Sequence, residues 1–114
     1  MKNKGETRMA KKVKITIFKR FSPEEIFGKE MFYPDGRKMV ACPLFKDGQE
    51  IVVKTIYADP PEDFKCSWGW NDLFKDISVL SCGGDFTHTE PNVTYTTCRD
   101  GMKPVVFKLE RIED

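Results

Sequence analysis

The 114-residue sequence lacks a long apolar run and has no excess of charge of one sign. No stretch approaches the roughly 20 apolar residues that cross a bilayer, and the basic N-terminus lacks the apolar core of a signal peptide. The 19 Lys and Arg residues nearly balance the 18 Asp and Glu residues, which gives a net charge of +1 and no global field to attract a polyanion. The sequence therefore predicts a cytoplasmic protein with no membrane and no nucleic-acid partner.

The sequence also lacks closely spaced cysteine pairs and has only one histidine. With His88 as the sole histidine, a metal site with two histidine ligands is excluded. No Cys-x-x-Cys pair is present, and that spacing is what identifies most structural zinc motifs. The four cysteines of a chain without a secretory signal are expected to be reduced, which leaves metal binding, redox chemistry or plain burial as their roles.

The composition is that of an ordinary folded domain. Hydrophobic residues make up 39% of the chain and charged residues 32%, enough apolar surface to offset the entropy lost on folding. A chain of this length builds one core but not two. We expect residues 1–11 to form a mobile tail, because they show no hydrophobic periodicity, and residues 12–114 to form a single α+β domain.

Four segments have the pattern of β-strands. Residues 12–18 alternate between apolar and polar side chains, and residues 51–53 are a β-branched run that follows an Asp-Gly turn. Residues 93–98 have strand composition, and residues 104–112 alternate again. The Arg-Asp-Gly sequence at 99–101 predicts a hairpin between these last two strands.

Two segments have the pattern of helices. Ser22 is a predicted N-cap, Pro23 suits a first turn, and Glu25 can close a capping box in a short helix that ends at Gly28. Apolar residues at helical spacing predict the main helix over residues 67–81. The expected fold is α+β, with four or five mostly antiparallel strands in a small sheet, the main helix packed on it, and one short helix.

Several short motifs occur in order along nearly the whole chain. They are Cys42-Pro-Leu-Phe with Gly48-Gln-Glu, Cys66-Ser-Trp-Gly-Trp, Gly83-Gly-Asp-Phe, and a closing segment from Cys98 to Ile112 that contains Asp-Gly, Pro-Val, Phe-Lys and Glu-Arg-Ile. Together they resemble a family of small, uncharacterised prokaryotic proteins called conserved hypothetical proteins. The resemblance covers residues 13–112 and implies no activity.

The resemblance implies a shared thiol site. Its pattern includes cysteines at the positions of Cys42, Cys66 and Cys98, whereas an apolar residue usually stands in place of Cys82. An aromatic residue often stands in place of His88. The resemblance therefore makes Cys82 the least involved of the four thiols and gives His88 no family-wide role.

Cys42, Cys66 and Cys98 all lie near the expected ends of helices and strands. Rigid elements hold binding groups at such places, so three thiols distant in sequence could converge. A metal site would need three or four soft ligands, with zinc or iron as the metal and His88 or Cys82 as a fourth ligand. The leading hypothesis is a small thiol-based module that binds a metal or a ligand through these three cysteines.

Two other hypotheses stay open. In the first, the cysteines only fill the core, as free cysteines often do, and a surface carrying Trp68 or Trp70 forms a homo-oligomer of a non-enzymatic interaction protein. In the second, the protein is a thiol-dependent enzyme that acts through Cys66, because the N-terminus of a helix favours a thiolate.

Overall fold

The computed structural model describes residues 11–54 and 59–112. In chain order the elements are β1 (Lys12–Arg20), α2 (Pro23–Phe27), β2 (Glu50–Val53), α3 (Ser67–Ser81), β3 (Val93–Thr97) and β4 (Val105–Ile112). The predicted α+β class is confirmed, with four strands, one main helix and one short helix. The expected tail falls almost wholly outside the described residues, and neither helix is long and apolar enough to cross a membrane.

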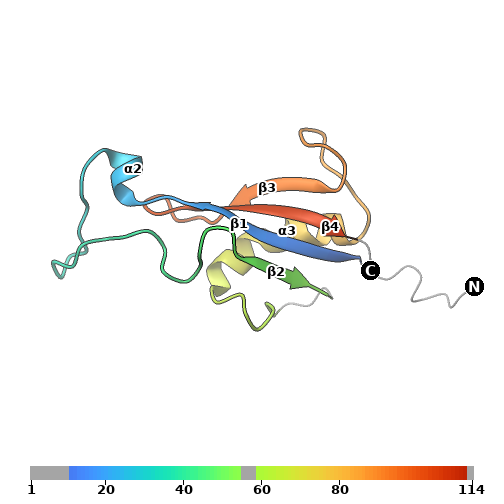
Figure 1. Ribbon diagram of the computed structural model, residues 1–114, viewed down its shortest axis with the longest axis horizontal. Coiled ribbons are helices and arrows are strands. Elements are labelled where there is room, and N and C mark those ends of the chain that lie inside the picture. Colours follow the sequence, from blue (N-terminus) through green and yellow to red (C-terminus); the bar gives the residue numbers. More distant parts are fainter. Residues whose placement is uncertain (1–10, 55–58, 113–114) are drawn as a thin grey trace, which may run out of the picture.

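The four strands form one antiparallel sheet in the order β2-β1-β4-β3 (Figure 1). The first and last strands of the chain are neighbours at its centre, paired from Lys12 opposite Ile112 to Arg20 opposite Val105. The register shifts between Ile17 and Lys19, so Phe18 has no partner on β4 and its side chain is exposed. This bulge places Phe18 outside the ladder, which resumes with Lys19 opposite Val106 and Arg20 opposite Val105.

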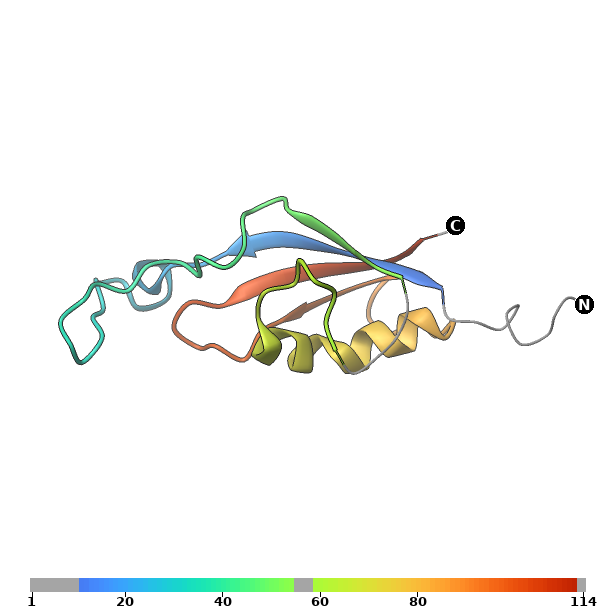
Figure 2. The same ribbon diagram turned by 90° about the horizontal axis from the view of Figure 1, so that it is seen from below.

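Helix α3 covers one face of the sheet (Figure 2). Its bounds are those predicted from the apolar spacing, and it contributes Trp70, Leu73, Ile77 and Leu80 to the core. The facing strands and loops supply Val13, Ile15, Ile17, Phe45, Ile51, Val53, Phe64, Val105, Phe107 and Leu109. Burial of each such side chain contributes about 1.5–3 kcal/mol, so this layer provides the main driving force for folding.

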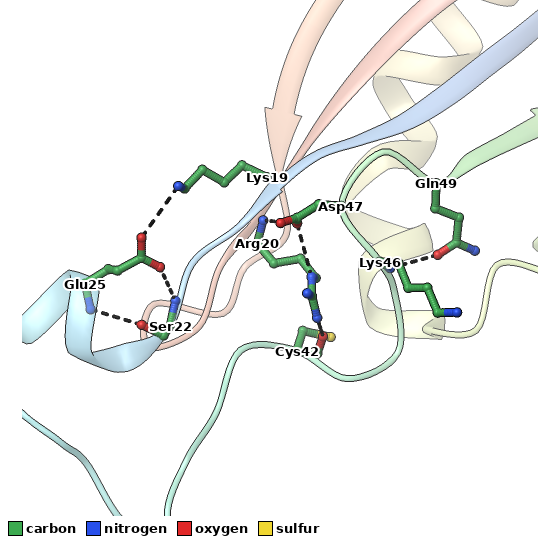
Figure 3. A network of polar contacts seen from close by, with 8 residues as sticks. All are labelled: Lys19, Arg20, Ser22, Glu25, Cys42, Lys46, Asp47 and Gln49. Carbon is green, nitrogen blue, oxygen red and sulfur yellow. Dashed lines mark hydrogen bonds and ion pairs between the residues drawn. The ribbon is translucent and has the colours of Figure 1, made fainter.

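Helix α2 is held by the predicted capping box, shown in Figure 3. The Ser22 hydroxyl accepts from the Glu25 N–H at 3.2 Å, and the Glu25 carboxylate accepts from the Ser22 N–H at 2.8 Å. That second bond, more than the nearby Lys19 ammonium, lowers the pKa of Glu25 below its ordinary value. Gly28 ends the helix with a φ of 77°, a left-handed conformation that glycine adopts without strain.

Arg111, near the end of β4, ties the C-terminus of α3 to the sheet. Its guanidinium donates to the carbonyls of Leu80 at 2.9 Å and Gly84 at 2.7 Å. It also donates to the Asp85 carboxylate at 2.9 Å and to the Asn92 side chain. Main-chain N–H groups of residues 82–84 already donate to the last carbonyls of the helix, so Arg111 adds a second donor at Leu80 and fixes the loop that leads to β3.

Replacement of Arg111 by Met should lower the free energy of unfolding by about 3 kcal/mol. It removes the donor of the partly buried Gly84 carbonyl and the charged hydrogen bonds to Leu80 and Asp85. The stability of Arg111→Lys should fall between those of the wild type and Arg111→Met, since one ammonium reaches fewer acceptors than a guanidinium. Urea denaturation measures both. The control is Arg37→Met, which removes an exposed pair with Asp35 and should cost less than about 1 kcal/mol. Equal losses at the two arginines would contradict this account.

Candidate functional site

One pocket brings together the three cysteines that the sequence singles out. Cys42 comes from the loop before β2, Cys66 directly precedes α3, and Cys98 directly follows β3. All three are half-buried and line a cavity of about 170 Å³. Segments far apart in the chain therefore converge at the end of the sheet where α3 begins.

The deeper wall of the pocket is apolar. Phe45, Val105 and Phe107 are buried lining residues, and the Phe45 and Phe107 rings meet edge to face with centroids 5.6 Å apart. Leu44 and Trp68 also line the pocket, and both are exposed, Trp68 with 70% of its surface. The cavity thus runs from two exposed apolar side chains to the aromatic part of the core.

Arg20, at the end of β1, holds the loop that carries Cys42 (Figure 3). Its guanidinium donates to the Cys42 carbonyl at 2.9 Å and to the Asp47 carboxylate at 3.1 Å. The same Asp47 oxygen accepts from the Arg20 main-chain N–H at 2.9 Å. That main-chain bond, followed by the guanidinium bond, lowers the pKa of Asp47 below its ordinary value.

Cys66 is the N-cap of α3. Its backbone is extended, with φ −131° and ψ 109°, and its sulfur accepts from the Gly69 N–H at 3.3 Å. Its carbonyl accepts the first helical bond, from the Trp70 N–H at 2.9 Å. A thiol therefore occupies the place of the hydroxyl or carboxylate that usually caps a helix, and this cap fixes one wall of the pocket.

Cys98 closes the hairpin between β3 and β4. Its N–H donates to the Val105 carbonyl at 3.2 Å, and the Val105 N–H approaches the Cys98 sulfur at 3.4 Å. The predicted strand over residues 93–98 ends one residue earlier, at Thr97. Cys98 is thus the first residue of the hairpin loop, and its side chain faces the pocket.

Asp100 organises that loop, as the turn prediction requires. One carboxylate oxygen accepts from the N–H groups of Met102 and Lys103 at 2.9 and 3.0 Å, and the other accepts from the Lys103 ammonium at 2.7 Å. Burial acts to raise the pKa of Asp100, but these donors outweigh it and the pKa is lowered. The hydrogen bond to Asp100 in turn raises the pKa of Lys103.

Arg99 and Trp68 meet at the rim of the pocket. The Arg99 guanidinium lies over the indole, 5.5 Å from the ring centroid, and the Arg99 N–H donates to the Asp72 carboxylate at 2.7 Å. Neither Arg99 nor Lys103 is recognisable as a site residue from the sequence, although both line the pocket. The sequence signal that could have identified them is their position within five residues of Cys98, a candidate site residue, at a predicted turn.

The structure does not gather metal ligands around these thiols. Within residues 11–54 and 59–112, no group of three or more His, Cys, Asp or Glu side chains is arranged to hold a metal ion. Cys82 is the C-cap of α3, and His88 lies in the loop beyond it. A helix of 15 residues is about 22 Å long, so Cys82 lies far from Cys66 at the other end. Neither Cys82 nor His88 is among the residues that line the pocket.

The pocket matches a small, mostly apolar molecule in size and chemistry. Cavities of about 150 Å³ hold a benzene molecule, so a volume of about 170 Å³ accommodates one ring or a short branched chain. Sulfur is polarisable and contacts aromatic rings favourably, so thiols suit such a wall.

Cys66→Ala should lower the free energy of unfolding by about 0.5–2 kcal/mol, because it removes the acceptor for the Gly69 N–H. Cys66→Ser should retain most of the stability, since a hydroxyl is a stronger cap than a thiol. Urea denaturation distinguishes them. If alanine and serine destabilise equally, the thiol contributes packing and does not cap the helix.

Asp100→Asn should keep the turn but lose the charge. A carboxyl with a lowered pKa stabilises the fold above its unfolded pKa, ordinarily 3.8, and that stabilisation disappears as pH falls through the folded value. The variant should therefore be less stable than the wild type at about pH 6, and the difference should shrink as the pH falls below 3.8. Thermal unfolding across this range tests the expectation, and a pH-independent difference would contradict it.

The sequence matches none of the protein-family models, curated proteins or solved structures with which it was compared. The resemblance to the family of conserved hypothetical proteins therefore stays a prediction, and no relative supplies a function for this chain.

Proposed function

We propose that the protein is a thiol-lined binding module for a small apolar molecule. One observation carries the proposal: Cys42, Cys66 and Cys98, from three separate segments, line the same cavity. Cysteines that only filled the core would be expected among its fully buried residues. These three are instead half-buried at its edge, while the centre is filled by aliphatic and aromatic side chains.

A small organic ligand suits the cavity better than a metal ion. The sulfurs of Cys66 and Cys98 accept from the main-chain N–H groups of Gly69 and Val105, which is compatible with either occupant. A thiolate that binds zinc or iron needs partners of the same kind within bonding distance, and the described residues supply no such group. A ring placed between the thiols would keep both hydrogen bonds and replace water against an apolar wall.

The interaction-protein hypothesis accounts for fewer observations. It relies on Trp68, which is 70% exposed and could contact a second chain. Trp68 also lines the cavity and lies beneath Arg99, so a role at the rim of the pocket explains the same exposure. For the thiol-enzyme hypothesis, the recorded partner of the Cys66 sulfur is a main-chain donor, which cannot remove a proton from the thiol.

Benzyl alcohol, a neutral molecule with one ring, is the probe for this proposal. In a ¹⁵N-labelled sample it should shift the amide signals of Gly69 and Val105, whose N–H groups contact the thiols of the pocket. Signals at the far end of α3, such as that of Cys82, should not move. Saturable shifts confined to the pocket support the proposal, and the absence of any saturable shift there refutes it.

A matched pair of substitutions tests the location. Cys42→Phe places a ring in the cavity and should abolish the shifts, whereas Cys82→Phe makes the same change at an exposed position outside it and should leave them intact. An alkylation experiment covers the case in which Cys42→Phe does not fold. Benzyl alcohol should slow iodoacetamide labelling of Cys42, Cys66 and Cys98 in the wild type but not that of Cys82. Equal protection of all four would contradict the proposal.

A further inference from the structure

The rim of the pocket carries one positive charge without a carboxylate partner. Arg99 lines the cavity, and its guanidinium lies over the ring of Trp68, 5.5 Å from the centroid. Within the described part of the chain no carboxylate lies within ion-pair distance of it. An arginine stacked on an aromatic face keeps its N–H groups at the edge of the guanidinium plane, directed away from the ring and available to an acceptor.

The other charges around the pocket are already matched. The Lys103 ammonium is held by Asp100 at 2.7 Å, and both Asp100 oxygens are used inside the turn. The Asp72 carboxylate accepts from the main-chain N–H of Arg99, which positions the arginine without engaging its side chain. The first turn of α3, which begins beside the cavity, contains no acidic residue to offset its positive end. Among the residues that the structure describes, Arg99 therefore carries the unpaired positive charge at the rim of the pocket.

We infer that the ligand is a small monocarboxylate whose apolar part lies between the three thiols and whose carboxylate is bound by Arg99. This rests on the proposed function, because it assigns the chemical class of the molecule in the same pocket. The volume of about 170 Å³ limits the apolar part to about one ring or a short branched chain. A guanidinium binds a carboxylate through two parallel hydrogen bonds, which orients the acid with its carboxylate outward.

Two positional facts support this orientation. Arg99 follows Cys98 directly in the chain, so the charge and one thiol wall are fixed by the same hairpin loop. Trp68 is two residues beyond Cys66, so the stacking platform and a second thiol wall are fixed by the same helix start. A ligand that touches both thiols and Arg99 therefore bridges the two elements that form the pocket.

The test compares three molecules that share one ring and differ in charge: benzoate, benzyl alcohol and benzylamine. Their affinities are measured from the amide shifts of Gly69 and Val105. The wild type should bind benzoate about tenfold more tightly than benzyl alcohol, and benzylamine most weakly. Arg99→Gln should remove the preference for benzoate while it keeps the binding of benzyl alcohol. Lys75→Gln, which removes an 86% exposed charge from the same helix, should change neither affinity.

The outcomes separate the two proposals. Equal affinity of the wild type for benzoate and benzyl alcohol overturns the carboxylate assignment and leaves the pocket as a neutral binding site. A benzoate preference that survives in Arg99→Gln overturns the role of Arg99. If none of the three molecules produces saturable shifts at Gly69 and Val105, the proposed function itself fails.

Discussion

The central pairing of β1 with β4 is the constraint on which the rest of the structure depends. Alternate residues of these two strands face α3, and each strand carries an arginine at or next to its last residue that holds a segment outside the sheet. Arg111 binds the C-terminus of α3 and the following loop, while Arg20 binds the loop that carries Cys42. The pairing therefore sets the orientation of the helix and also brings a distant loop to its N-terminus.

Local patterns carry much of the fold. The bounds of α3 follow from apolar spacing, and α2 follows from Ser22 and Glu25, because the interactions that decide both lie within a few residues. The hairpin before β4 also depends on local interactions, since Asp100 forms the turn by accepting from the N–H groups of residues two and three positions later. In such segments propensity, pattern and packing agree, so the sequence alone is informative.

The arrangement of the site is not local in this sense. Cys42 reaches the pocket because Arg20 donates to its carbonyl across 22 positions of the chain. The pattern of apolar and polar residues does not predict such a contact. The same holds for the suggested fourth ligands: Cys82 ends α3 at the opposite end from Cys66, and neither it nor His88 lines the pocket. The sequence could name the three cysteines as candidates, but only the structure shows that they line one cavity.

The same groups that would contact a ligand also hold the fold together. The Cys66 sulfur caps α3, the Cys98 sulfur lies against the Val105 N–H, and Asp100 shapes the loop that presents Arg99. These contacts join the thiol walls of the pocket to the buried wall formed by Phe45, Val105 and Phe107. A molecule that bridges α3 and the hairpin would add contacts between elements that otherwise meet mainly through the core. A molecule that binds only the folded protein stabilises the whole fold by mass action, so binding in this pocket should raise the free energy of unfolding.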